Sequence, residues 1–236
     1  MRKLSILICL LALACTQGED QSSSEIFIDT SLYPAEAVNI EDLIDEIYLI
    51  PLETTPDCAI GTFWKYDQDK SNIFYLLKQD LTIYRFTSEG KYVNKFNHLG
   101  KGPGEYTRIR HFEILPDSET ILISSTGQKK MIQYRNTGEF INEFQIPTSS
   151  GQVKVLEENT VALHIGRIAA MYDSTQKHDL IFLDLEGNVK AKYYPHNRPL
   201  HFEFGKNFSR PNSDGSFFYS KQFDFYLYTI KDTASP

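Results

Sequence analysis

Apolar and polar residues alternate along short segments of the chain, with a period of two. In the stretch TIYRF, Ile83 and Arg85 fall on one side of an extended chain. Tyr84 and Phe86 fall on the other side, as a pleated strand requires. Segments of this kind predict β-strands through most of the chain, and only residues 34–47 suit a short helix of one or two turns.

The alternating segments repeat along the chain. IYRFTSEGKYVNKF at residues 83–96 aligns with MIQYRNTGEFINEF at residues 131–144, 48 residues further on, with matching aromatic, glycine and asparagine positions. A third copy, IFLDLEGNVKAKYY, occupies residues 181–194, and a fourth begins at residues 215–220 and 226–230. A period of 40 to 50 residues with the same order of strands is typical of β-propeller blades.

Each copy has the same internal order of strands and turns. The turns SEGK, NTGE and LEGN place Gly90, Gly138 and Gly187 where a hairpin favours positive φ. A β-sandwich would also alternate, but it has no reason to repeat its glycine and aromatic positions. We therefore predict an all-β fold, a β-propeller with blades of about 48 residues of which about four are present. The predicted strands of the first copy are residues 72–77, 82–87 and 92–96.

A glycine-rich stretch, GKGPGEY, follows the first copy. Phosphate-binding loops of this composition open a helix, whereas strands flank this one on both sides. Gly100, Gly102 and Gly104 allow a sharp turn. Pro103 restricts φ, and we expect Glu105 to accept backbone N–H bonds. The stretch is predicted to be a structural corner between two blades, with a ligand-binding loop on one rim as the alternative.

Several of these motifs together resemble a known family. YLIPLETT at residues 48–55, the following Ile60-Gly61, FxxxGKYV at residues 86–93 and GKGPGEY resemble the six-bladed β-propeller lipoproteins of Gram-negative gut bacteria, which are similar to NHL-repeat propellers. The resemblance covers residues 47–230. It implies a propeller fold and a location in the cell envelope, and it implies no particular ligand.

The chain is short for a six-bladed propeller. Six blades of this size need roughly 290 residues, whereas the chain has 236. We expect one or two blades to be missing, which leaves two blade faces and a strand edge exposed and gives either an open assembly or a truncated gene product. The segment EIYLIPLE at residues 46–53 is predicted to be a closing strand that pairs into the last blade.

The N-terminal residues have the pattern of an export signal. Arg2 and Lys3 precede an apolar run at residues 4–14 that is too short to cross a bilayer. The run ends in LALAC and resembles a bacterial lipoprotein signal with lipid attachment at Cys15, although Ala12 stands where that family usually has leucine. A plain signal peptide cut elsewhere is the alternative.

These features divide the chain into three parts. Residues 1–15 form the signal and lipobox, residues 16–25 a flexible polar stalk, and residues 26–236 a partial propeller domain. A lipid on Cys15 would anchor the protein to the outer membrane, on its periplasmic or its external side. The membrane is then one predicted partner. An internal disulfide is excluded, because Cys9 lies in the signal and Cys58 is left alone.

Charge and motif content limit the possible functions. The formal charge is −7, or −9 without the signal, and basic clusters are absent, so nucleic acid is not an expected partner. His196, His201 and Glu203, and the HFE stretch at residues 111–113, match no standard zinc spacing. No nucleophile motif occurs. We therefore assign no catalytic residue, no metal and no cofactor.

Two classes of function remain. The 16 Phe and 14 Tyr residues suit a binding or scaffolding module that holds a glycan, a peptide or a protein partner. The alternative is an envelope hydrolase or lyase with its site in the central channel of the propeller. Convergent histidine and carboxylate groups in that channel would favour the enzyme.

Lipid attachment is tested by metabolic labelling with a radioactive fatty acid in a Gram-negative host. We expect label and membrane association in the wild type and loss of both in Cys15→Ala, because acylation needs the thiol. Cys9→Ala is the matched control and should keep the label. Equal labelling of all three proteins, or none in the wild type, would contradict the prediction.

Overall fold

The computed structural model describes residues 41, 44–68, 72–77, 80–147, 152–156, 160–165, 177–196, 207–209, 212, 214–221, 224 and 226–232. The chain divides into two compact units, Met1–Tyr48 and Leu49–Pro236, and every described strand lies in the second. The predicted signal, stalk and Cys15, and most of the predicted helical segment, lie outside the described residues. In the described part of the chain, no helix is long and apolar enough to cross a membrane.

The described residues form fourteen β-strands, and the predicted all-β class is confirmed. The predicted strands at residues 72–77 and 92–96 coincide with β2 and β4. The strands are β1 (Phe63–Gln68), β2 (Asn72–Leu77), β3 (Ile83–Thr87), β4 (Tyr92–Phe96), β5 (Ile109–Ile114), β6 (Thr120–Ser125), β7 (Lys130–Arg135), β8 (Phe140–Gln145), β9 (Gln152–Leu156), β10 (Thr160–His164), β11 (His178–Leu183), β12 (Val189–Pro195), β13 (Phe217–Ser220) and β14 (Leu227–Ile230).

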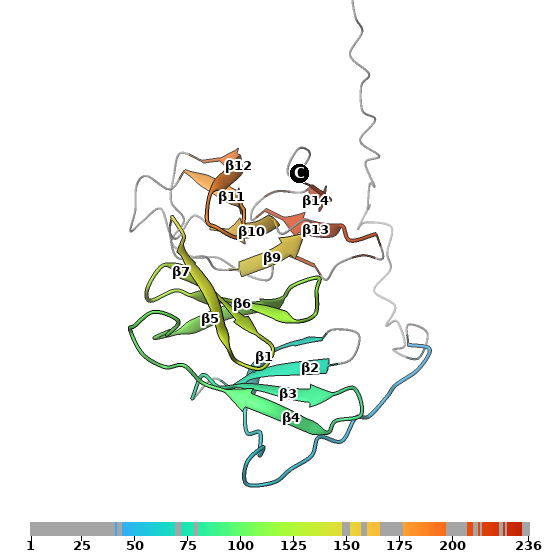
Figure 1. Cartoon of the computed structure of the whole chain (residues 1–236). Helices are drawn as coiled ribbons and strands as arrows, with labels where there is room; N and C mark the ends of the chain where they lie inside the picture. The colour runs from blue at the N-terminus through green and yellow to red at the C-terminus, as the bar shows by residue number, and fades with distance from the viewer. Residues whose placement is uncertain are drawn as a thin grey trace, which may run out of the picture. The chain divides into compact units, whose positions relative to one another are not determined.

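Sequence neighbours pair to form four antiparallel sheets, which follow one another along the chain (Figure 1). We call them blade 1 (β1 to β4), blade 2 (β5 to β8), blade 3 (β9 to β12) and blade 4 (β13 and β14). A single bridge between Phe208 and Tyr219 adds residue 208 to blade 4, on the side where the other blades carry their first strand. Sheets of this kind in series are the blades of a β-propeller, in the number predicted.

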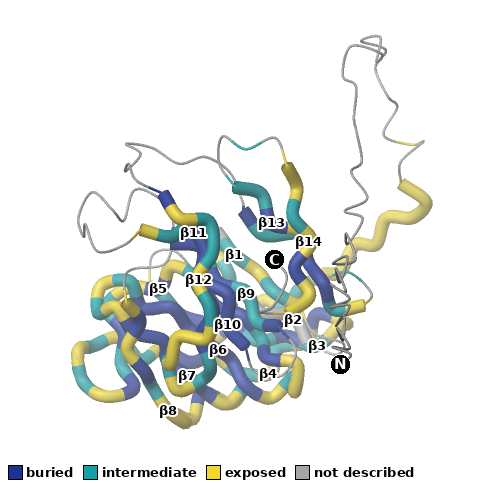
Figure 2. Tube along the Cα trace, turned by 90° about the horizontal axis from the view of Figure 1, so that it is seen from above, coloured by how far each residue is buried: buried dark blue, intermediate teal, exposed yellow. Residues whose placement is uncertain are grey.

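The hydrophobic core lies between the blades. The two middle strands of blades 2 and 3 are almost wholly buried, while their fourth strands are largely exposed (Figure 2). One cluster joins blades 1 and 2, a second joins blades 2 and 3, and a third joins blades 3 and 4. Each sheet is therefore covered by its neighbour, since a sheet with two apolar faces needs cover on both.

The repeated glycines explain how neighbouring blades approach so closely. Gly138 has a φ of +94°, and a Cβ built on it would lie 2.7 Å from Cβ of Phe96 in the preceding blade. Gly187, with a φ of +91°, would meet the ring of Phe144 at 2.9 Å in the same way. The glycine thus allows the positive φ of its own turn and the close approach of the outer strand of the preceding blade.

The segment at residues 46–53 differs from its prediction. It was expected to be a closing strand, but the structure gives it no strand pairing. Its second half lies against blade 1: Glu53 N donates to Gly90 O at 2.8 Å, and Leu52 packs against the cluster of Cys58, Tyr84 and Phe86. The physical reason is that the described four-stranded sheets are formed by sequence neighbours, β1 to β4, β5 to β8 and β9 to β12, which already pair with one another.

A substitution at Gly138 tests the glycine contact. Gly138→Ala should lower the free energy of unfolding by about 2 kcal/mol, because alanine disfavours positive φ and its Cβ would collide with Phe96. Urea unfolding followed by fluorescence measures the change. Gly61→Ala is the matched control, since a Cβ there meets nothing within 4 Å, and should have little effect. Equal effects of the two substitutions would contradict the proposed role.

Candidate functional site

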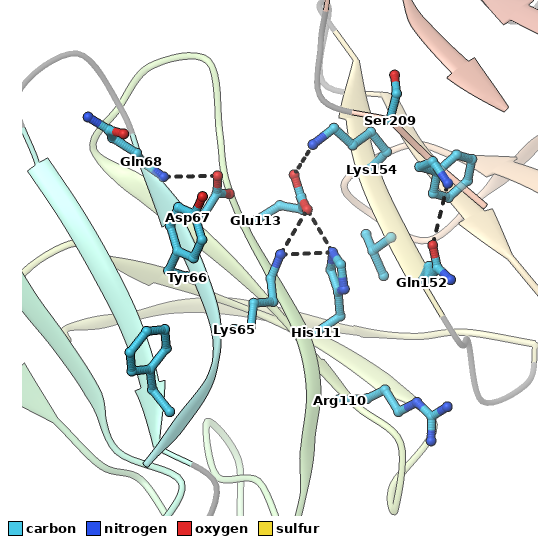
Figure 3. A pocket seen from close by; sticks show the side chains of 13 residues that line it. Lys65, Tyr66, Asp67, Gln68, Arg110, His111, Glu113, Gln152, Lys154 and Ser209 are labelled. Atoms are coloured by element: carbon cyan, nitrogen blue, oxygen red, sulfur yellow. Dashed lines mark hydrogen bonds and ion pairs between the residues drawn. The ribbon is translucent and has the colours of Figure 1, made fainter. Parts of the chain in front are cut away.

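The first strands of the blades line a cavity of about 900 Å³ (Figure 3). β1 lies beside β5, and β5 lies beside β9, so that residues from distant parts of the sequence face the same space. Residue 208 and its neighbour supply the wall from blade 4. The lining residues are Phe63, Lys65, Tyr66, Asp67, Gln68, Arg110, His111, Glu113, Gln152, Val153, Lys154, Phe208 and Ser209.

Strand register places the polar lining residues in two rows. β1 and β5 both shift register near their start, which brings Lys65 and His111 to equivalent positions in blades 1 and 2. Two residues further along each strand, Asp67 of β1 and Glu113 of β5 also occupy equivalent positions. The first row is Lys65, His111 and Gln152, and the second is Asp67, Glu113, Lys154 and Ser209. Alternate residues of these inner strands are thus polar and face the cavity.

Glu113 is the centre of the charged cluster (Figure 3). Its Oε1 lies 2.6 Å from His111 Nε2 and 3.4 Å from Lys65 Nζ. Its Oε2 accepts a hydrogen bond from Lys154 Nζ at 3.0 Å. Because these groups come from β1, β5 and β9, one buried carboxylate connects three blades.

The surroundings of Glu113 determine its protonation. Burial alone would raise the pKa of Glu113, but the hydrogen bond from His111 and the charges of Lys65 and Lys154 outweigh burial and hold that pKa well below its usual range. Burial also lowers the pKa of His111, despite the nearby carboxylate. At neutral pH the imidazole is therefore neutral and the carboxylate is ionised.

Asp67 responds in the opposite direction. Burial, reinforced by the negative charge of Glu113, raises the pKa of Asp67, although Lys65 and Lys154 oppose the rise. The carboxylate accepts a hydrogen bond from Gln68 N at 3.0 Å. The pKa values of these two carboxyl groups, which occupy equivalent positions in neighbouring blades, are therefore shifted in opposite directions.

Aromatic rings and one further cation complete the site. Phe63 and Tyr66 keep 44% and 46% of their surface exposed at the cavity wall. Arg110 is exposed and lies at the cavity beside His111 (Figure 3). Exposed rings next to fixed polar groups suit a ligand that has both flat apolar faces and hydrogen-bonding groups.

The predicted corner GKGPGEY connects β4 to β5 and contributes nothing to the cavity lining. Gly102 N donates to Glu105 Oε2 at 2.8 Å. Gly104 has a φ of +67°, and its N–H donates to a carboxylate of β8 at 2.9 Å. Gly100 and the exposed Pro103 lie in the same connection. These contacts fix the corner to the adjoining blades.

The structure separates the residues that the sequence considered for metal binding. His111 and Glu113 reach the cavity, whereas His196 is buried in blade 3, 3.6 Å from Asp179, and does not line it. His201 and Glu203 lie outside the described residues. Within the described ranges no three His, Cys, Asp or Glu residues are placed to hold a metal ion.

Sequence reasoning missed Lys65, Asp67 and Lys154. A signal for them was available, because each is a charged residue inside a segment with a strand pattern. An alignment of the first strands of the blades pairs Lys65 with His111, because both strands carry the same register shift at the same place.

Fold and site together define a β-propeller with a charged cavity at the inner strands of its blades. Residues 24–235 match the family described as a domain of unknown function, DUF4934, and the chain belongs to that family. Comparison with curated proteins gives no match.

One solved structure shows the same fold at low sequence identity, and two others are more distantly similar. A candidate exported protein from Bacteroides fragilis NCTC 9343 has a TM-score of 0.68 at 18% identity, over 80% of this chain and 53% of that one. A DUF4221 family member from Bacteroides vulgatus ATCC 8482 has a TM-score of 0.48 at 13% identity, over 72% and 58%. Streptogramin B lyase has a TM-score of 0.46 at 12% identity, over 70% of this chain and 50% of that one. The chain thus spans between half and three fifths of these proteins' lengths.

Replacing each of the two equivalent carboxyl groups by its amide tests the charged cluster, because the two substitutions should have different effects on stability. Glu113→Gln should lower the free energy of unfolding by about 3 kcal/mol at pH 7, because it leaves Lys65 and Lys154 without their shared counter-charge. Asp67→Asn should leave stability unchanged or raise it, since folding disfavours the ionised form of Asp67.

The two variants should also differ in pH dependence when urea unfolding is repeated between pH 3 and 7. The depressed pKa of Glu113 stabilises the fold above the ordinary glutamate value of about 4.3, and that contribution is lost as pH falls further. The gap between wild type and Glu113→Gln should therefore narrow below about pH 4.3. A constant gap would show that the variant acts through packing and not through charge.

Proposed function

We propose that this protein is a binding module of the cell envelope whose cavity holds a glycan or a peptide. The observation that carries the proposal is the composition of the cavity: two half-exposed aromatic rings beside two rows of polar side chains. Tyr66 and Phe63 offer flat faces on which a sugar ring or an apolar side chain can stack. Arg110 and the polar rows offer hydrogen bonds to hydroxyl, amide or carboxylate groups.

The location is proposed from the N-terminal sequence. A lipid on Cys15 and the polar residues 16–25 would hold the propeller near the outer membrane, as in the six-bladed lipoproteins that the motifs resemble. Similarity to a candidate exported protein of Bacteroides supports an envelope or secreted location. A protein held there encounters polysaccharides and peptides, which agrees with the chemistry of the cavity.

A hydrolase or lyase is the second candidate, and one observation favours it. Asp67 and Glu113 line the same cavity, and their pKa values are shifted in opposite directions, as in acid and base pairs of catalytic sites. Binding is preferred, because Glu113 is already engaged by His111 and two lysines. A carboxylate held in this way has a structural role that explains its acidity.

Binding is tested with the detergent-solubilised full chain on glycan and peptide arrays, followed by calorimetry with each hit. We expect Tyr66→Ala to weaken binding at least tenfold, because it removes the stacking face. Tyr226→Ala is the matched control: Tyr226 is also exposed, at 59% against 46% for Tyr66, but it does not line the cavity. Array hits that lose no affinity with Tyr66→Ala would place the ligand elsewhere. Cleavage of a hit, abolished by Asp67→Asn, would establish the enzyme instead.

A further inference from the structure

Arg110 is placed at the cavity by a bulge in β5. The strand pairs with β6 at residues 109 and 111 but not at Arg110, which is the extra residue between them. A bulge interrupts the regular alternation of side chains along a strand, and bulges are common beside binding sites. Arg110 and His111, which follow one another in the sequence, both line the cavity (Figure 3).

The guanidinium group of Arg110 is available to a ligand. The residue is exposed, and its side chain forms no ion pair or hydrogen bond with any residue that the structure describes. A guanidinium group offers its N–H donors in a planar fork that matches the two oxygens of a carboxylate. A carboxylate is therefore a ligand group that this side chain can bind through two hydrogen bonds at once.

The charge balance of the cavity is opposite to that of the chain. Of the described residues that line the cavity, Lys65, Arg110 and Lys154 are cations, and Asp67 and Glu113 are carboxylates. The whole chain has 24 lysine and arginine residues against 31 aspartate and glutamate residues. Positive charge is thus concentrated at the cavity, where it attracts an anionic ligand.

The two carboxylates are engaged within the protein. The side chain of Glu113 is 6% exposed, against 20% for Lys65 and 12% for Lys154. Both oxygens of Asp67 accept hydrogen bonds from backbone N–H groups, at 3.0 and 3.4 Å. A ligand that enters the cavity therefore reaches the cations more readily than the carboxylates.

The composition of the lining favours a sugar over a peptide. Ten of the 13 lining residues carry a polar side chain, and of the other three Val153 is buried. Bound peptides and proteins are anchored mainly by apolar and aromatic side chains that fill pockets. A sugar ring carries several hydroxyl groups, each of which both donates and accepts hydrogen bonds, and so needs many polar partners. The described lining supplies such partners.

We propose that the ligand of the cavity is an acidic glycan and that the carboxylate of a uronic acid unit binds Arg110. This inference rests on the proposed function, because it names the class of glycan that the same cavity holds. Lys65 and Lys154 add their attraction to that of Arg110, and the polar rows bind hydroxyl groups of the glycan. Arg110 is then the residue that determines the preference for acidic over neutral sugars.

The preference for a carboxylate is tested by calorimetry of the detergent-solubilised full chain. The probes are trisaccharides of galacturonic, glucuronic and mannuronic acid, the methyl ester of each, and triglutamate. The esters keep the sugar rings and remove the charge. We expect at least one uronate to bind at least tenfold more tightly than its ester and than triglutamate, because a charge-assisted bidentate pair forms only with the free acid.

The other outcomes separate this inference from the proposed function. Equal affinity for acids and esters, or array hits that are all neutral glycans, would overturn the preference for an acid and leave glycan binding intact. Tighter binding of triglutamate would overturn the assignment to a glycan. If neither these probes nor any glycan or peptide on the arrays binds, both the inference and the proposed function fail.

Substitutions at Arg110 test its role with the same probes. Arg110→Gln should weaken uronate binding at least tenfold and leave ester binding unchanged, and Arg110→Lys should lose less, because it keeps the charge but not the fork. Arg108→Gln is the matched control: Arg108 is also exposed but does not line the cavity, and its loss changes the net charge equally. Equal losses in Arg110→Gln and Arg108→Gln, or uronate binding by Arg110→Gln at wild-type affinity, would overturn the assignment to Arg110.

Discussion

The structure depends on one constraint: each sheet has two apolar faces, and each face must be covered. The three interblade clusters satisfy it for blades 2 and 3, which have a neighbour on both sides. In the described part of the chain blade 1 has blade 2 as its neighbour, and its other face is covered by the chain that leads into it, through Leu52, Cys58 and Ile60. Burial of roughly 25 cal/mol per Å² makes such cover the main favourable contribution to folding.

Because the faces of the sheets are covered by apolar residues, polar residues are confined to the inner and outer edges of the sheets. The inner edges meet at the cavity, and this is where the charged residues gather. Glu113 gains little net stability from its lysines, since desolvation offsets much of the attraction. Its effect is positional: it holds Lys65 and Lys154 together across three blades, in a cavity whose walls also carry Asp67 with the opposite shift in pKa.

The sequence by itself determined the strands, the repeat and the turns. These are local properties: alternation with a period of two identifies a strand, and Gly90, Gly138 and Gly187 are needed because their turns require positive φ. The tertiary structure decided the rest. Lys65, Glu113 and Lys154 are distant in sequence and meet only because β1, β5 and β9 pack side by side, which no local pattern reveals. The fate of residues 46–53 is also a tertiary matter, because a segment with strand character becomes a strand only beside an edge that can accept its hydrogen bonds.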